Sequence, residues 1–266
     1  MTTPPSATLP TERPPAPQPP HSAWRQVHRQ ACEPYRHSGH FAWFFARGKL
    51  QRDPVFRSLL ERGDLSLTGH PGLGSAGPRV VDIGCGQGLM ASLLQVCANA
   101  DAAGRWPHEW GPAPRAAQYT GIELMPRDVE RAQAAVGTLP LAPRFVCGDM
   151  RHAELPACDL VVILDVLHYV THAEQAALLA RVRQALGTHG RLVTRVGDMA
   201  QPRGFAASQW VDRVVTMVRG HRVPPTFGRT VAQWRDLLKQ LGFSRVQVVP
   251  MSRGTPFANT LLVADT

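Results

Sequence analysis

The sequence predicts an α/β protein with a doubly wound, mostly parallel seven-stranded sheet and an antiparallel hairpin near its carboxyl end. First, an apolar run at residues 80–83, rich in β-branched residues, leads into a cluster of glycines and then into a helix-like segment. Second, strand-like and helix-like segments alternate from there on, which is typical of parallel strands joined by right-handed crossovers. Third, the last two strand-like segments follow each other with no helix between them, which predicts that they pair antiparallel.

The first 21 residues are expected to form a disordered, proline-rich tail. Eight of the first twenty residues are proline, and no apolar core typical of a signal peptide or anchor is present. Elsewhere no apolar run approaches the roughly 20 residues of a membrane-spanning helix. We therefore expect a protein that is not associated with a membrane.

The cysteine content and the net charge indicate the cellular compartment and the kind of partner to expect. The five cysteines form an odd set without a CxxC pair, which favours reduced thiols, a cytoplasmic location and no metal site. The net charge is +9, but its cations are scattered and nearly all arginine, as a GC-rich genome would encode. A nucleic-acid partner is therefore not the first expectation.

Residues 22–78 are expected to form an N-terminal helical lid and a linker. Helix-like pieces with mixed polar and apolar faces are followed by the glycine- and proline-rich loop "TGHPGLGSAGP". The main domain is expected over residues 79–266.

The first half of that domain is expected to contain three strands. Strands are predicted near residue 80 and at 118–123 and 144–149, with a helix at 91–98 and an irregular insert at 99–117. A further helix should start at Pro126 and stop at Gly137, since proline favours a first turn and glycine a helix end.

The second half is expected to contain four strands. These are predicted at 158–165, 190–196, 244–250 and 259–265, with helices at 171–187, 206–219 and 230–241. Thr171 with Glu174, and Thr230 with Gln233, have the spacing of a capping box at a helix start.

The glycine motif indicates the kind of ligand. Gly84, Gly86 and Gly88 are spaced G-x-G-x-G, whereas the dinucleotide fingerprint needs a third small residue where this chain has Leu89. Asp82 would repel a pyrophosphate, and no Gly-Lys-Ser/Thr of a P-loop follows. A nucleoside with positive charge and no phosphate fits better.

With these residues the sequence resembles the class I S-adenosylmethionine-dependent methyltransferases, which have a Rossmann-like fold. "VVDIGCGQG" is similar to the first motif of that family, "TGIE" to the second and "CGDM" to the third. The resemblance implies S-adenosyl-L-methionine as the cofactor and the following residues around it: Asp82, Gly84, Cys85, Gly86, Gly88, Glu123, Leu124, Asp149, Met150 and Asp165.

The chemistry of Glu123 agrees with this implication. A carboxylate at a strand end can accept strong hydrogen bonds from the two hydroxyls of a ribose. The alternative is that Glu123 only caps the following helix, because carboxylates favour helix starts.

The segment "DVLHYV" after the fourth strand is similar to the branch of the family that methylates oxygen or carbon of small molecules. His168 is the candidate catalytic residue, as a base or by orienting a hydroxyl; alternatively it only satisfies nearby backbone groups. Candidate acceptor-binding residues are Phe44, Arg47, Tyr169 and Arg195, because aromatic bulk with cations suits an aromatic or acyl acceptor. The stretch "FARGKLQRDPVF" also resembles methyltransferases encoded with bacterial aryl polyene genes, which would imply a phenolic acceptor, free or attached to a carrier protein.

Two alternatives stay open at this point. An RNA or protein methyltransferase would present a contiguous basic face. A non-catalytic S-adenosylmethionine-binding protein would bind the cofactor without consuming it.

Overall fold

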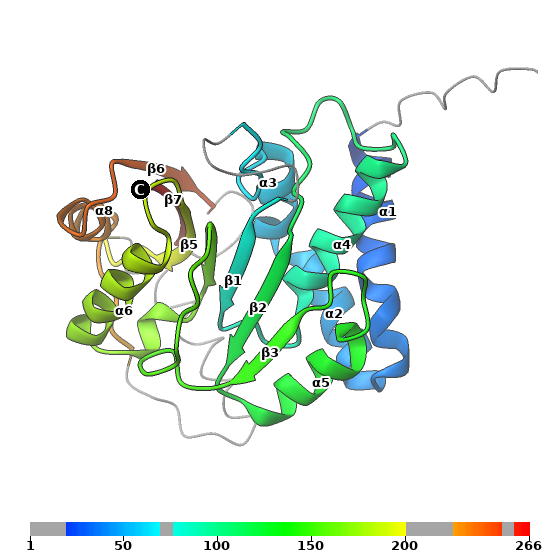
Figure 1. The fold of residues 1–266 in the computed structure, drawn as a ribbon, viewed down its shortest axis with the longest axis horizontal. Helices are drawn as coiled ribbons and strands as arrows, with labels where there is room; N and C mark the ends of the chain where they lie inside the picture. The colour runs from blue at the N-terminus through cyan, green and yellow to red at the C-terminus, as the bar shows by residue number, and fades with distance from the viewer. Residues whose placement is uncertain (1–19, 70–76, 201–225, 252–257) are drawn as a thin grey trace, which may run out of the picture.

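A computed structural model describes residues 20–69, 77–200, 226–251 and 258–266, and its centre is one seven-stranded sheet (Figure 1). The strand order is β3-β2-β1-β4-β5-β7-β6. The strands are β1 (Arg79–Ile83), β2 (Gln118–Glu123), β3 (Arg144–Cys147), β4 (Leu160–Leu164), β5 (Arg191–Gly197), β6 (Arg245–Pro250) and β7 (Asn259–Asp265).

Six of the seven strands run in the same direction, and only β7 is reversed. β1 pairs in parallel with β2 and β4, and β7 pairs antiparallel with both β5 and β6. The predicted fold class and the antiparallel hairpin are therefore confirmed. The order of the hairpin was not foreseen: β7 is inserted between β5 and β6, so the chain reaches the sheet edge first and then turns back.

Helices cover both faces of the sheet (Figure 1). They are α1 (Pro20–Cys32), α2 (His40–Arg52), α3 (Pro54–Arg62), α4 (Leu89–Ala102), α5 (Pro126–Val136), α6 (His172–Ala185) and α8 (Val231–Gln240), with the 3-10 turns η1 (Glu33–His37) and η2 (Leu167–Tyr169). Side chains from α1 to α5 share one apolar core with one face of the sheet, and those of α6 and α8 share a second core with the other face.

The amino-terminal helices belong to the first of these cores. Val27 of α1, Leu50 of α2 and Leu59 of α3 are buried in the same cluster as Leu93 of α4 and Val193 of β5. Alternating strand residues such as Val161 and Leu262 face the second cluster instead. Burial on both faces explains why the central strands are continuous apolar runs.

Local signals set most helix ends. The capping boxes at Thr171 and Thr230 are both formed, as predicted. Gly137 ends α5 as expected, but in a right-handed conformation with φ −61°. Its N–H still donates to the carbonyl of Gln133, so this helix ends without the left-handed residue that usually selects glycine.

Some predicted features lie outside the described residues. These are nearly all of the proline-rich tail (1–19), part of the loop before β1 (70–76) and the helix predicted at 206–219. Within the described part, no helix is long and apolar enough to cross a membrane.

Candidate donor and acceptor sites

A turn of three left-handed glycines joins β1 to α4 at the carboxyl edge of the sheet. Gly84, Gly86 and Gly88 have φ angles of +76°, +53° and +76°. A Cβ on Gly84 would lie 2.5 Å from Val166, and one on Gly88 would lie 2.9 Å from Phe145. A Cβ on Gly86 would meet nothing within 4 Å. Packing therefore requires the outer two glycines, whereas the middle one faces open space where a ligand can approach the backbone.

Glu123, at the end of β2, is bonded to this turn. One of its carboxylate oxygens accepts the N–H of Gly86 at 3.0 Å, and the other accepts the N–H of Met125 at 2.9 Å. Each oxygen keeps a lone pair for a further donor. Burial raises the pKa of Glu123, and the two backbone donors oppose that rise. The carboxylate thus bonds both the residue that precedes α5 and the glycine turn, so holding the start of α5 and facing a ligand at the turn do not exclude each other.

Asp82, the last but one residue of β1, is buried beneath the turn. Its Oδ2 accepts the Tyr119 hydroxyl at 2.6 Å, and its side chain is 5% exposed. Burial raises its pKa to about 7, helped by the nearby charge of Glu123 and opposed by the Tyr119 hydrogen bond. A carboxyl group in this state gains from a cation brought close to it.

The residues around the turn fit a cationic nucleoside. Asp82, Glu123 and Asp128 form an acidic group, in which the charge of Glu123 helps to raise the pKa of Asp82 and the charge of Asp128 helps to raise the pKa of Glu123. Gln87, inside the turn, is 1% exposed, and its Oε1 has no hydrogen-bond partner in the part of the chain that the structure describes. These carboxylates and the Gln87 amide oxygen are hydrogen-bond acceptors. They can therefore hold the ribose hydroxyls and the ammonium group of S-adenosylmethionine.

Cys85 and Leu124 lie differently beside this site. The thiol of Cys85 packs against β2, because a Cβ on Gly121 would lie 2.7 Å from its sulfur. Burial raises the pKa of Cys85 well above its ordinary value, so it is an inert packing group. Leu124, next to Glu123, is 60% exposed, which leaves an apolar surface at the carboxyl edge of the sheet.

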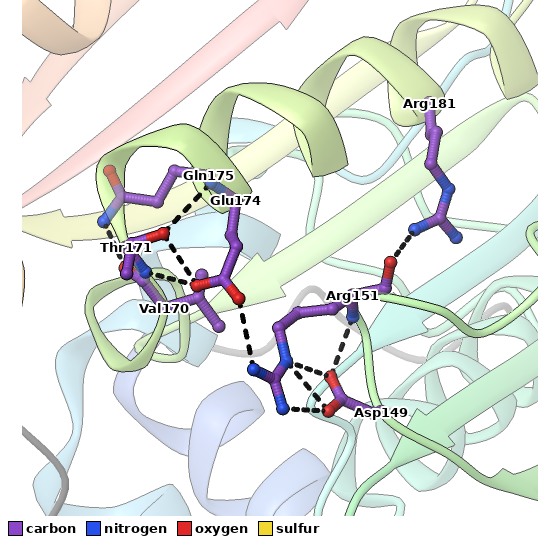
Figure 2. A network of polar contacts seen from close by, with 7 residues as sticks. All are labelled: Asp149, Arg151, Val170, Thr171, Glu174, Gln175 and Arg181. Carbon is purple, nitrogen blue, oxygen red and sulfur yellow. Dashed lines mark hydrogen bonds and ion pairs between the residues drawn. The ribbon is translucent and has the colours of Figure 1, made fainter.

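Asp149 follows β3 and is held by Arg151 (Figure 2). Its two oxygens accept from the Arg151 guanidinium at 2.6–3.0 Å, and Oδ1 also accepts the Arg151 N–H at 2.9 Å. Hydrogen bonding from Arg151 lowers the pKa of Asp149 despite some burial. Arg151 also pairs with Glu174 of the α6 capping box at 3.1 Å.

The turn that contains Asp149 is fixed from α6 as well. Arg181 donates to the carbonyls of Met150 at 3.2 Å and Arg151 at 2.6 Å, and also to the carbonyl of Ala153 (Figure 2 shows the bond to Arg151). Met150 packs against the second core. The segment predicted to border the adenine is thus a rigid turn with an ionised carboxylate.

Asp165 and Arg195 belong to a cluster of four charges at the ends of β4 and β5. The Arg195 guanidinium pairs with Asp165 and with Asp53, while Lys49 lies 2.8 Å from Asp53 and 3.7 Å from Asp165. Asp165 has φ +61°, which is uncommon for a residue other than glycine. The Arg195 side chain is only 4% exposed. Arg195 is therefore engaged by two carboxylates and joins α2 and α3 to the sheet.

His168 and Tyr169 lie in η2, which directly follows the Asp165 corner. Their ring centroids are 4.1 Å apart, and the carbonyl of His168 accepts the N–H of Phe227 at 2.8 Å. The side-chain amide of Gln175, in α6, donates to the carbonyl of Leu167 at 3.1 Å and to the carbonyl of Phe227 at 2.7 Å. The loop with His168 is thus supported from α6 and from residue 227.

Phe44 and Arg47 interact within α2. The Phe44 ring is 63% exposed and meets Trp43 edge to face, and the Arg47 guanidinium lies 4.5 Å from the centre of the Trp43 ring. These contacts do not join either residue to the glycine turn. Both stay predictions as acceptor-binding residues.

Several residues at the site were not foreseen from the sequence. Tyr119, Gln87 and Asp128 surround the glycine turn, and Asp53 completes the charge cluster. Gln87 could have been found from its place between two motif glycines, and Asp128 from its place in the first turn after "TGIE". No local signal marks Tyr119 or Asp53, because their partners lie 37 and 142 residues away.

Part of the chain is similar in sequence to known proteins. Residues 118–244 match the family model of the O-methyltransferase domain. A carboxy-S-adenosyl-L-methionine synthase from Glaesserella parasuis serovar 5 (strain SH0165) is 27% identical over 118 residues, which are 43% of this chain and 42% of that protein. The chain thus matches less than half the length of that curated relative.

Solved structures share the fold over most of the chain. Human N-acetylserotonin methyltransferase in complex with S-adenosylmethionine has a TM-score of 0.52 at 19% identity, covering 94% of this chain and 60% of that one. Magnesium protoporphyrin IX methyltransferase from Synechocystis PCC 6803, with bound S-adenosylhomocysteine, has a TM-score of 0.50 at 21% identity, covering 92% and 93%. The family model thus matches part of the chain, and the solved methyltransferase structures show that the chain shares their fold.

Proposed function

We propose that this protein transfers the methyl group of S-adenosylmethionine to a hydroxyl oxygen of a small aromatic acceptor. The observation that carries the proposal is the acidic glycine turn, where Gly86 faces open space and Glu123 closes one side. The match to the O-methyltransferase domain favours oxygen over carbon as the accepting atom.

The bound cofactor supplies an electrophilic methyl group on a sulfonium, so the protein's main task is to align the acceptor. His168 follows β4 at the carboxyl edge of the sheet, two residues after the Gly84-packing side chain of Val166. We assign to it the acceptance of the proton that a hydroxyl loses as its oxygen gains the methyl group. Tyr169, whose ring lies beside that of His168 at a tilted angle, would line the acceptor side.

The amino-terminal segment supports an aromatic acceptor. α2 supplies the rings of Phe41 and Phe44, which are 50% and 63% exposed, and ends in the Lys49–Asp53 pair at the Asp165 corner. Phe44 and Arg47 are assigned here to binding of the acceptor, where their side chains would cover it and exclude water.

The test is an acceptor screen with the full chain and labelled S-adenosylmethionine, across phenols, aryl acids and aryl acids attached to a carrier protein. We expect label in an O-methyl group of one acceptor class, identified by mass spectrometry, and a loss of about 100-fold in kcat for His168→Ala. Tight cofactor binding with no turnover on any acceptor would favour a non-catalytic binding protein. Salt-sensitive methylation of RNA or protein would favour the other alternative.

A further inference from the structure

A hydrogen bond connects the glycine turn to the amino-terminal segment. The Tyr35 hydroxyl, in η1, donates to the backbone carbonyl of Gln87 at 2.8 Å, and Tyr35 is fully buried. Gln87 lies between Gly86 and Gly88, so this bond fixes the centre of the turn. The partners are 52 residues apart in the chain.

The side chain of Gln87 is held by α5. Its Nε2 donates to Asp128 Oδ1 of α5 at 3.2 Å, and the same oxygen accepts from Arg131 at 3.0 Å. The Arg131 guanidinium in turn lies 4.5 Å from the centre of the Phe41 ring of α2. Two contacts therefore connect residues 35–41 with the turn, one direct and one through α5.

A glycine turn needs such support because it is intrinsically loose. Three glycines within five residues lose more conformational entropy on ordering than other residues would. A ligand that binds the backbone of a loose turn must provide that ordering free energy, which weakens its affinity. A turn that is already fixed binds the same ligand more tightly.

We propose that Tyr35 is a positioning residue for the cofactor, and that η1 is a fixed part of the donor site as well as the start of the acceptor-side helices. The Tyr35 hydroxyl orders Gln87 and so presents the open backbone at Gly86 beside Glu123. This inference rests on the assignment of the glycine turn to S-adenosylmethionine and is independent of the acceptor.

The chain offers a matched control for a test. The Ser92 hydroxyl donates to the carbonyl of Ala31 at 2.7 Å, and Ser92 is 1% exposed. This is also a buried hydroxyl-to-carbonyl bond between the amino-terminal segment and the region that follows β1, but it lies one turn into α4. Tyr35→Phe and Ser92→Ala each remove one such hydroxyl.

The experiment measures the Kd of S-adenosylhomocysteine by calorimetry for the full chain and both variants, together with the Tm of each. We expect both variants to lower Tm by roughly 2–4 °C, whereas only Tyr35→Phe weakens binding, by about tenfold. Equal Kd values for Tyr35→Phe and the unmodified protein would overturn the inference. Failure of the unmodified protein to bind S-adenosylhomocysteine would instead overturn the donor site itself.

A second measurement needs no variant. If Tyr35 and the turn are coupled, a ligand on the turn must also stabilise η1, because such coupling is reciprocal. Amide hydrogen exchange should therefore slow in residues 33–37 as well as in 84–88 when S-adenosylhomocysteine binds. Slowing confined to 84–88 would contradict the inference even if Tyr35→Phe failed to fold.

Discussion

At the scale of single residues, the donor site depends on carboxylates whose charge is not stabilised until a cation arrives. Asp82 and Glu123 are held close together, and burial raises the pKa of both. Tyr119 and the backbone N–H of Gly86 fix them in place without providing a full positive charge. Ionising these two carboxyl groups is therefore unfavourable in the free protein, and a bound sulfonium nucleoside would make it more favourable.

Glu123→Gln is expected to weaken the binding of S-adenosylhomocysteine by about 30-fold, close to 2 kcal/mol. The amide would place an N–H donor against one of the two backbone donors that Glu123 now accepts, and it lacks the charge that strengthens bonds from ribose hydroxyls. Calorimetry measures the change. Glu130→Gln, on the exposed side of α5, is the control and should leave the Kd unchanged.

The affinity for S-adenosylmethionine is expected to rise about tenfold between pH 5.5 and 7.5. Asp82 has a pKa of about 7 in the free protein, so it is mostly protonated at the lower end of this range. A bound cation lowers that pKa, and between the two values binding releases a proton and strengthens as the pH rises. Calorimetry in buffers of different ionisation enthalpy counts the protons released. Asp82→Asn should bind with little pH dependence, and a flat profile in the unmodified protein would refute this role of Asp82.

At the scale of elements, the charge cluster at the ends of β4 and β5 holds α2 and α3 in place. Asp53 is the N-cap of α3, where it accepts the N–H of Val55, and it also pairs with Arg195 of β5. Burial opposes ionisation of Asp53, but hydrogen bonds and charge from Arg195 and Lys49 outweigh it, so its pKa lies far below the ordinary value. Asp53 therefore stays ionised throughout the range in which proteins usually work.

Asp53→Asn is expected to reduce the free energy of unfolding by about 3 kcal/mol, since it leaves the buried Arg195 with one carboxylate. Lys49→Met is the matched comparison, because the lysine side chain is 36% exposed and pairs with the same Asp53. Its cost should stay below about 1 kcal/mol. Urea unfolding of both variants at pH 7 measures the two losses in the free energy of unfolding. Equal losses would show that the buried pair of Asp53 and Arg195 stabilises the protein no more than a surface ion pair does.

At the scale of the whole molecule, one core joins the amino-terminal helices to the sheet. Leu59 of α3 is fully buried in the same cluster as Leu160 and Val193 of the central strands. The helices expected to act as a lid are therefore packed on the sheet through their inner faces. Any movement on acceptor binding would be confined to their outer side chains or to a coordinated shift.

Leu59→Ala is expected to lower the free energy of unfolding by about 3 kcal/mol and to shift one cooperative transition. Leu178→Ala, on the buried face of α6 in the second core, should shift the same single transition by a similar amount. Far- and near-ultraviolet circular dichroism should give coincident melting curves for both variants. Two separate transitions in Leu59→Ala would mean that the amino-terminal helices unfold independently of the sheet.

The sequence alone was sufficient for features whose causes are local. The seven strands and the capping boxes at Thr171 and Thr230 follow from apolar periodicity and short-range side-chain spacing. These depend on residues a few positions apart, so the information lies within a short window of the chain.

Only the tertiary structure decided features that depend on distant partners. The insertion of β7 between β5 and β6, the bond from Tyr35 to Gln87 and the pairing of Asp53 with Arg195 join residues that are far apart in the chain. Their energies come from burial and charge pairing that exist only after the chain has folded. No short stretch of sequence specifies them, because a tyrosine or an aspartate acquires its partner only from the packing around it.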